Sequence, residues 1–355
     1  MFLYLLLGIL SIYQAADATP RTRNGLGTIA LEEAWQFPEL AYLAENYAPP
    51  VGQTTEDLSN NLVDIQGHRL QLMDEYGIDY MILSWTSPGP QGYSNQTEAE
   101  AMATKANDYL YEQIQNNTAR FGGFAALSMH DPVQAAAELN RTVTEYGFVG
   151  ALLNDYQESG PDNGTLLFYD QPEYDVFWQM ATDLDVPIYM HPRLPVTQEI
   201  DLLWQGRKWL LTAPWQFAND LSSHVLGIAT NGVFDRFPSL RMIVGHNGER
   251  IPSDFWRADH MLERQKLLGM PMNSTIVGYL KKNIWITTSG EFYNDILRYH
   301  INQLGADRIL FSVDYPYETV EEASRWFARF PFADDDEKYL ISRGNAISIM
   351  KLDLR

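Results

Sequence analysis

The sequence contains no cysteine, and this absence removes several kinds of site at once. Disulfide bonds, zinc sites built from thiolates and cysteine nucleophiles are all excluded. A chain without disulfides has to be stabilised by its core, and 45% apolar residues over a length of 355 are ample for one. That length suits a single (β/α)8 barrel and does not require two domains.

Positively charged residues are also scarce. The chain has 25 lysines and arginines against 46 aspartates and glutamates, so its formal net charge is -21. Such a charge repels phosphate backbones and anionic lipid surfaces, and neither a nucleic acid nor a membrane surface is expected as a partner. An anionic substrate would need local positive charge or a metal ion.

No internal repeat, low-complexity block or proline-rich linker divides the chain, which favours one domain. Residues 2–13 are apolar and are followed by Ala16-Asp17-Ala18, a small-residue cleavage pattern, and the stretch is too short to span a bilayer. We therefore predict a signal peptide at residues 1–18 and the barrel domain at residues 19–355. The usual basic start of a signal peptide is missing, and the alternative is a cytoplasmic protein with a mistaken gene start.

Glycosylation sequons support the predicted secretion. Five of them begin at Asn95, Asn116, Asn140, Asn163 and Asn273. Because such sequons are used on secreted proteins, we expect a secreted glycoprotein.

Eight short apolar runs alternate with amphipathic segments, an order that predicts βα units and a parallel sheet. Apolar residues recur at helical spacing in stretches such as 98–117 and 132–146, and Gly77 and Gly147 stand where helices should stop. We predict an α/β fold, a single (β/α)8 TIM-type barrel. The strands are expected near residues 28–32, 79–85, 121–127, 150–154, 186–191, 241–246, 285–288 and 309–314.

Four of these runs end in an acidic or imidazole side chain: Glu32, His191, His246 and Asp314. In a barrel of parallel strands, metal ligands and catalytic groups gather where the strands end. Each residue alone has a plain explanation as a solvated helix start, a hydrogen-bonded core histidine or a helix cap. Their placement on four different strands favours a metal site. The other histidines are interpreted as structural: His68, His130, His224, His260 and His300.

Seven strings at the expected strand ends match a known family. They are Ile29-Ala-Leu-Glu-Glu33, Ser128-Met-His-Asp-Pro132, Gly150-Ala-Leu-Leu-Asn154, His191-Pro-Arg193, Gly245-His-Asn-Gly-Glu249, Thr287-Thr-Ser-Gly290 and Gly305-Ala-Asp-Arg-Ile-Leu-Phe-Ser-Val-Asp-Tyr-Pro316. From about residue 28 to 354 the sequence closely resembles the amidohydrolase-related (ACMSD-like) decarboxylases of hydroxylated benzoic acids. The fungal 2,3-dihydroxybenzoate (o-pyrocatechuate) decarboxylases resemble it most, with the γ-resorcylate decarboxylases close by. The resemblance implies the barrel of the metal-dependent hydrolase superfamily.

The resemblance also implies a role for each strand-end residue. Glu32, His191 and Asp314 would bind one divalent metal, and His246 with Glu249 would form a catalytic pair beside it. Two carboxylates and one histidine suit Zn²⁺, Mg²⁺ or Mn²⁺ alike.

The first strand departs from the pattern of the hydrolytic relatives, which carry His-x-His or Glu-x-His there. The second position in this chain is Ala34, and the dihydroxybenzoate branch shares the alanine. The alanine therefore favours a decarboxylase of that branch. The alternative function is that of a metal-dependent hydrolase of a lactone or amide. A third alternative is a secreted inactive paralogue that acts as a binding protein.

The expected reaction is nonoxidative decarboxylation of an ortho-hydroxylated benzoic acid, with 2,3-dihydroxybenzoate as the first candidate. Direct loss of CO2 would leave an aryl carbanion, so the ring carbon must be protonated before the carbon-carbon bond breaks. By resemblance, Asp314 donates that proton while His246, polarised by Glu249, assists. The family also implies a homodimer or homotetramer.

Five further residues are candidates for contact with the substrate. Arg193 would pair with the substrate carboxylate, or else belong to a structural ion pair. Trp215, Phe217, Phe292 and Tyr317 are candidates for the walls around the aromatic ring. Tyr317 stands where relatives usually have phenylalanine, so its hydroxyl would favour a different or more polar ring substituent.

Overall fold

The structure is a computed structural model that describes residues 25–161 and 164–354. The predicted signal peptide at residues 1–18 and the sequon residue Asn163 lie outside the described residues. Within those two ranges, no helix combines the length and the apolar character that crossing a bilayer requires.

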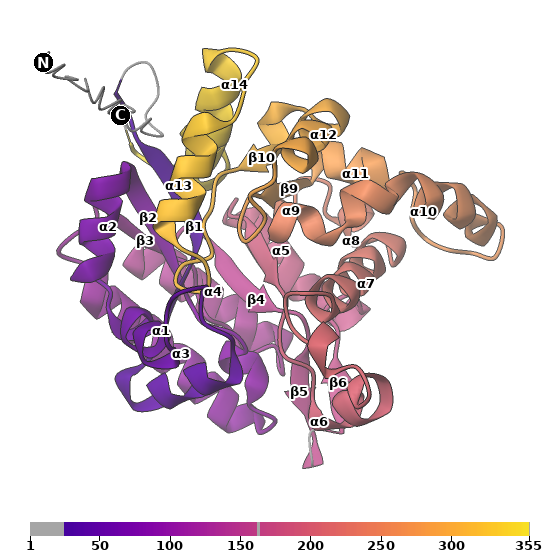
Figure 1. Ribbon diagram of the computed structural model, residues 1–355. Coiled ribbons are helices and arrows are strands. Elements are labelled where there is room, and N and C mark those ends of the chain that lie inside the picture. The colour runs from indigo at the N-terminus through magenta and orange to yellow at the C-terminus, as the bar shows by residue number, and fades with distance from the viewer. Residues whose placement is uncertain (1–24, 162–163, 355) are drawn as a thin grey trace, which may run out of the picture.

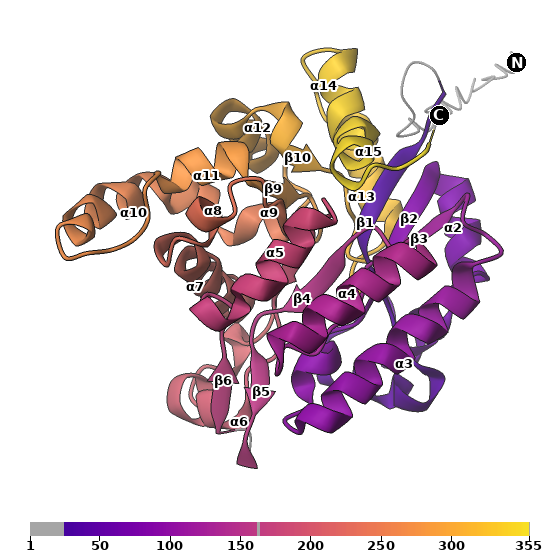
Figure 2. The same cartoon turned by 180° about the vertical axis from the view of Figure 1, so that it is seen from behind.

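In the described part of the chain, eight parallel strands follow one another around a barrel in sequence order (Figures 1 and 2). A parallel bridge between Ala125 and Ala151 joins the first three strands to the other five. Ala34 N donates to Tyr315 O at 2.7 Å and connects the first strand to the segment after the last. The predicted TIM-type barrel is confirmed. Its strands are β1 (Thr28–Trp35), β2 (Ile78–Trp85), β3 (Phe121–Gly123), β4 (Ala151–Asn154), β7 (Ile188–His191), β8 (Met242–Val244), β9 (Ile284–Thr287) and β10 (Ile309–Leu310).

A separate antiparallel hairpin of β5 (Gln157–Ser159) and β6 (Thr165–Leu167) follows β4. It was not predicted from the sequence, because its strands are short and largely polar. Figure 1 shows it projecting beyond the end of the barrel at which β4 finishes.

Helices surround the barrel. The helical stretches predicted at residues 98–117 and 132–146 correspond to α3 (Gln96–Ile114) and α4 (Pro132–Tyr146). Asp131 caps α4 by accepting from Val133 N and Gln134 N. Gly77 and Gly147 end α2 and α4 in the left-handed conformation expected of them. The α-helices are α1 (Thr55–Val63), α2 (His68–Tyr76), α3 (Gln96–Ile114), α4 (Pro132–Tyr146), α5 (Asp175–Asp183), α6 (Thr197–Glu199), α7 (Gln216–Thr230), α8 (Val233–Arg236), α9 (His246–Glu249), α10 (Ile251–Lys266), α11 (Ile276–Lys282), α12 (Asn294–Leu304), α13 (Val320–Arg329), α14 (Asp335–Tyr339) and α15 (Asn345–Met350).

Two layers of apolar side chains hold these elements together. The larger layer fills the space between strands and helices, with Trp35, Phe177 and Trp178 fully buried in it. The smaller layer fills the barrel interior, and α15 packs against it through Ile349 and Met350. Because α15 covers the end where the strands begin, the opposite end is left for polar residues.

Candidate metal centre and active site

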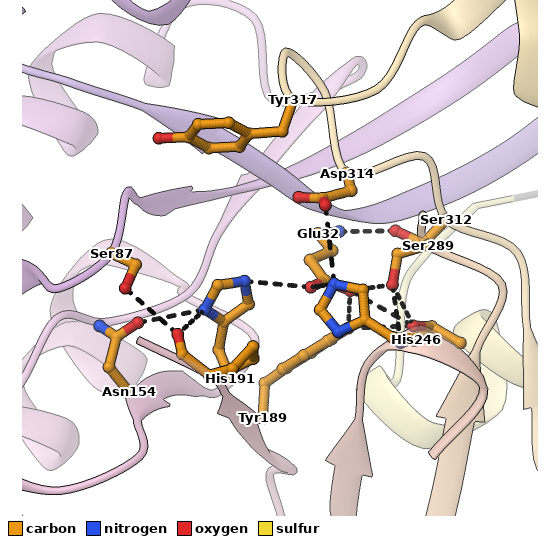
Figure 3. A network of polar contacts seen from close by, with 12 residues as sticks. Glu32, Ser87, Asn154, Tyr189, His191, His246, Ser289, Ser312, Asp314 and Tyr317 are labelled. Atoms are coloured by element: carbon orange, nitrogen blue, oxygen red, sulfur yellow. Dashed lines mark hydrogen bonds and ion pairs between the residues drawn. The ribbon is translucent and has the colours of Figure 1, made fainter. Parts of the chain in front are cut away.

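Glu32, His191, His246 and Asp314 lie together at one end of the barrel (Figure 3). His191 is the last residue of β7, Glu32 lies within β1, which continues to Trp35 beyond the predicted end, and His246 and Asp314 follow β8 and β10. One ligand atom from each residue lies within 4.8 Å of the others. Glu32 Oε1 is 3.2 Å from His191 Nε2 and 3.3 Å from His246 Nε2, and His246 Nε2 is 3.6 Å from Asp314 Oδ2. Two imidazole nitrogens and two carboxylates at this spacing are a suitable donor set for one divalent cation.

The two oxygens of Glu32 have different surroundings. Oε2 accepts hydrogen bonds from the hydroxyls of Tyr189 and Ser289, and from Thr287 Oγ1 at 3.3 Å. Oε1 is buried and has no hydrogen-bond donor. A buried carboxylate oxygen without a donor is costly, and a cation would satisfy it. The residues present therefore fit a metal ion.

The hydrogen bonds of the two histidines fix which ring nitrogen faces the centre. His191 Nδ1 lies 2.6 Å from Pro192 O and 3.2 Å from Asn154 Oδ1, and His246 Nδ1 lies 2.6 Å from Glu249 Oε1. All three partners are acceptors, so each Nδ1 carries a proton and donates it. Each Nε2 then faces the centre, where the nitrogen of a neutral imidazole can bind a metal.

Electrostatic effects act on the two carboxylates in opposite directions. Burial raises the pKa of Glu32, but the charge of His246 and the proximity of His191 outweigh it and bring the pKa down to about 2. Burial raises the pKa of Asp314 above its usual range, although the neighbouring His246 lowers it. Two carboxylates with pKa values pushed apart are typical of a charged group beside an acid.

The backbone around His246 adopts an unusual conformation. The φ angles of His246, Asn247, Gly248, Glu249 and Arg250 are 48°, 55°, 79°, 49° and 67°, so five successive residues lie in the left-handed region. This conformation costs roughly 1–2 kcal/mol for each residue with a side chain. It brings His246 and Glu249 face to face, and strain of this kind gathers at functional sites.

The structure thus brings together all five residues predicted for metal binding and catalysis: Glu32, His191, His246, Glu249 and Asp314. The sequence analysis set His246 apart from the three ligands. In the structure, its Nε2 is as close to Glu32 Oε1 as the Nε2 of His191 is. The division of roles between ligand and catalyst therefore stays a prediction.

A cleft of about 1030 Å³ opens above this centre, lined in part by His191, His246 and Asp314. Of the predicted aromatic contacts, Phe217 and Tyr317 line it. The Tyr317 hydroxyl lies 2.5 Å from Thr86 Oγ1, and its ring packs against Tyr47 with centroids 5.2 Å apart.

Arg193 lies outside the cleft. Its side chain is buried and forms an ion pair with Glu158. Nη1 donates to Gln91 O at 2.8 Å and to Tyr156 O at 3.1 Å. The structural ion pair that the sequence left open as an alternative is what the structure contains, because Glu158 on the unpredicted hairpin supplies the partner.

Trp215 and Phe292 do not line the cleft either. Trp215 is 45% exposed, and the guanidinium of Arg250 lies 4.1 Å from its ring centroid. Phe292 packs against Trp326 with ring centroids 5.5 Å apart. The structure thus places both aromatic rings in other contacts.

The hydroxyls that hold Glu32 were not predicted from the sequence: Tyr189, Thr287 and Ser289. A signal was available. Tyr189 precedes the ligand His191 by two residues, and alternate residues of a strand point to the same face. Polar residues two positions before a predicted ligand therefore mark its neighbours.

The family model for Amidohydrolase matches residues 56–352. The chain belongs to this family. Gamma-resorcylate decarboxylase of Rhizobium radiobacter is 42% identical over 330 residues, which are 93% of this chain and 99% of that protein. The 2,3-dihydroxybenzoate decarboxylase of Aspergillus niger is 26% identical over 306 residues, 59% of this chain and 100% of that protein. The predicted family is confirmed, and the identities rank these two decarboxylases in the reverse of the expected order.

Solved structures extend the similarity to the whole barrel. A 2,6-dihydroxybenzoate decarboxylase complexed with 2,6-dihydroxybenzoate has a TM-score of 0.87 and 40% identity, covering 92% of this chain and 100% of that one. A dihydroxybenzoic acid decarboxylase from Polaromonas sp. JS666, with bound manganese and the inhibitor 2-nitroresorcinol, has a TM-score of 0.87 and 39% identity, covering 93% and 98%.

Proposed function

We propose that this protein is a metal-dependent decarboxylase that converts an ortho-hydroxylated benzoic acid to the phenol and CO2. The observation that carries the proposal is the buried Glu32 Oε1, which has no hydrogen-bond donor and faces His191 and His246 at the cleft. Relatives that are decarboxylases of dihydroxybenzoates, at about 40% identity over most of the chain, support the same reaction.

Glu32, His191 and Asp314 would hold one divalent metal, and the manganese in the Polaromonas relative supports this cofactor class. When bound, the metal would offset the negative charge of the substrate carboxylate and ortho phenolate and so allow both to approach an acidic protein. The cleft walls then orient the ring over Asp314.

Asp314 is the proposed proton donor. Its proton moves to the ring carbon that bears the carboxylate and forms a carbon-hydrogen bond there. The bond from that carbon to the carboxylate then breaks, its electron pair returns to the ring, and CO2 leaves. His246, held by Glu249, lies 3.6 Å from Asp314 Oδ2 and is placed to return a proton to it.

The first substrate candidate becomes 2,6-dihydroxybenzoate, because the relatives with the higher identities act on or bind that acid. Its two ortho hydroxyls flank the carboxylate symmetrically. The hydroxyl of Tyr317 is hydrogen-bonded to Thr86. Where Tyr317 lines the cleft, it makes the wall more polar than a phenylalanine would.

The decisive experiment is CO2 release by the purified protein after chelation, with and without added Mn²⁺, Mg²⁺ or Zn²⁺. The panel contains 2,6-dihydroxybenzoate, 2,3-dihydroxybenzoate and salicylate, with unsubstituted benzoate as the control. We expect metal-dependent release from at least one ortho-hydroxylated acid and none from benzoate. No release from the panel by protein with bound metal would refute the proposal and favour the hydrolase.

We also propose a homo-oligomer. Trp256 is 69% exposed on α10, and Leu267 and Leu268 are 87% and 83% exposed just after it. Large apolar side chains gathered on one exposed segment are typical of an interaction surface. Light scattering on the purified protein should give twice or four times the mass of one chain, and a monomer at micromolar concentration would refute the proposal.

Secretion is a further proposal, supported by the sequons. Asn95, Asn116, Asn140 and Asn273 are all exposed, as acceptors of a glycan must be. Expression of the full chain in a secreting eukaryotic host should yield protein in the medium whose mass falls on treatment with a glycosidase. Unglycosylated protein that stays inside the cells would instead favour the mistaken gene start.

A further inference from the structure

The two carboxylates of the metal centre come from opposite ends of the chain, Glu32 from β1 and Asp314 from the segment after β10. β10 is only two residues long, so regular strand pairing does not reach Asp314. The distance between the two carboxylates must therefore be set by other contacts between β1 and residues 312–315.

Glu33 supplies the first of these contacts. Its side chain is fully buried, Oε1 accepts from Val313 N at 3.1 Å, and Oε2 accepts from Tyr315 N at 3.1 Å. The two backbone donors stand on either side of Asp314, whose φ angle of 77° is in the left-handed region. One carboxylate thus holds the backbone N–H of both neighbours of Asp314, and Asp314 between them has a conformation that aspartate seldom adopts.

Ser312 extends this contact to Glu32 itself. Ser312 Oγ donates to Glu33 Oε1 at 3.2 Å and accepts from Glu32 N at 2.9 Å and from Leu31 N at 3.3 Å. Figure 3 shows Ser312 beside the backbone of Glu32. The Ser312 hydroxyl therefore connects the backbone of Glu32 to the carboxylate of Glu33, which in turn holds Asp314.

Arg69 from α2 supports the same arrangement. It is fully buried, and its Nη2 donates to Ala34 O at 2.6 Å while its Nε donates to Asp64 O at 3.0 Å. Its guanidinium lies 4.7 Å from the ring centroid of Tyr315. The positive charge is thus fixed between β1 and the segment after β10. Burial raises the pKa of Glu33 to about 7, and the charge of Arg69 acts in the opposite direction.

We infer that Glu33 is a positioning residue of the metal centre, which fixes Asp314 relative to Glu32 without touching the metal or the substrate. The inference rests on the proposed function, because it concerns the same centre. In Glu33→Gln, an amide nitrogen replaces one acceptor and faces a backbone N–H, so Val313 or Tyr315 loses its bond. Asp314 is then held less firmly, and we expect the affinity for Mn²⁺ to fall roughly 10–100-fold.

The test is a titration of purified chains with Mn²⁺, followed by electron paramagnetic resonance, on wild type, Glu33→Gln and Ser312→Ala. Glu138→Gln is the matched control, because Glu138 is also buried and accepts from Asn107 Nδ2 and Arg141 Nη2, both at 2.7 Å, between α3 and α4. We expect weaker binding and an altered spectrum of bound Mn²⁺ in the first two variants. The control should melt at a lower temperature and bind Mn²⁺ as wild type does.

A folded Glu33→Gln protein with the affinity and spectrum of wild type would overturn the inference. If that variant does not fold, Ser312→Ala decides: weaker Mn²⁺ binding supports the positioning role, and unchanged binding overturns it. Wild type that binds no Mn²⁺ would instead refute the metal centre and with it the proposed function. Failure of the positioning role and failure of the proposed function are therefore distinguishable without any measurement of turnover.

Discussion

Glu32 and Asp314 are chemically similar carboxylates in one centre, and their partners make them different. Burial raises the pKa of both, but the charge of His246 and the donors around Glu32 outweigh burial there, whereas burial prevails at Asp314. The first is therefore suited to stay charged and bind a cation, and the second to carry a proton. At the scale of single residues, the role follows from the neighbours rather than from the residue type.

This difference predicts separable effects of two amide substitutions. Asp314→Asn should reduce kcat by roughly 100-fold or more, because it removes the proposed proton donor. Glu32→Gln should weaken metal affinity by roughly 10-fold or more and retain turnover at saturating metal, because no acid is lost. Measuring kcat as a function of Mn²⁺ concentration distinguishes the two. An Asp314→Asn enzyme with bound metal and full activity would contradict the mechanism.

His300 predicts a dependence of stability on pH. It is 2% exposed, its Nε2 has no hydrogen-bond partner, and burial lowers its pKa from 6.5 to about 4. Between these values the unfolded chain binds a proton that the folded chain does not, so stability is complete above pH 6.5 and falls towards pH 4. The loss attributable to this residue should be about 3 kcal/mol at pH 4.

Urea unfolding of wild type and His300→Asn at pH 7 and pH 4 measures this contribution, since other groups titrate alike in both proteins. Asparagine keeps a donor for Asn247 Oδ1, the partner of His300 Nδ1. Equal losses in the two proteins would show that His300 does not titrate on unfolding.

The residues that could be predicted from the sequence are those whose signal is local. Glu32, His191, His246 and Asp314 each end an apolar run, and the barrel brings such ends together. The position of Arg193 could not be predicted, because its partner Glu158 lies on a hairpin without an apolar pattern. Contacts between separate loops leave no periodicity in either loop.

Among the elements, the left-handed turn from His246 to Arg250 depends on Gly248. A Cβ atom there would lie 2.7 Å from Ile286 Cγ2 and 2.9 Å from Pro252 Cγ, and the φ angle is 79°. Gly147 offers a matched control, because its φ angle is 70° and a Cβ would meet nothing within 4 Å. Alanine at Gly147 therefore measures the backbone strain alone, and alanine at Gly248 measures the strain together with the steric overlap.

Gly147→Ala should cost roughly 1–2 kcal/mol, from the left-handed conformation alone. Gly248→Ala should cost roughly a further 1–3 kcal/mol, because the close contacts with β9 and α10 must move. It should also lower activity by displacing His246. Urea unfolding of both variants tests the comparison, and equal costs would mean that the neighbours of Gly248 yield freely.

The strands were predictable as elements, but their ends were not. The run from 309 to 314 reads as one strand, whereas β10 stops at Leu310. The reason is that the next backbone N–H groups do not pair with a strand: Phe311 N donates to Ile341 O and Ser312 N to Thr288 Oγ1. Val313 N and Tyr315 N then donate to the side chain of Glu33. A side-chain acceptor that is distant in sequence cannot be recognised from an apolar run.

For the whole molecule, the metal centre links the first strand to the segment after the last. A ligand that binds only the folded state stabilises it by about 2.7 kcal/mol when its free concentration is 100 times Kd. We expect urea unfolding in excess Mn²⁺ to show a gain of this size over unfolding in chelator. His191→Ala, which lacks one predicted ligand, should show little gain, and an equal gain in both proteins would place the stabilising ion elsewhere.

The location of Glu32 and Asp314 at the two ends of the chain also bears on biosynthesis. A ribosome releases Glu32 long before Asp314, so a chain that stops between them holds one carboxylate of the pair without the other. Metal capture by this pair therefore has to follow synthesis of residue 314. A bound ion would then distinguish chains that contain residue 314 from fragments that end before it.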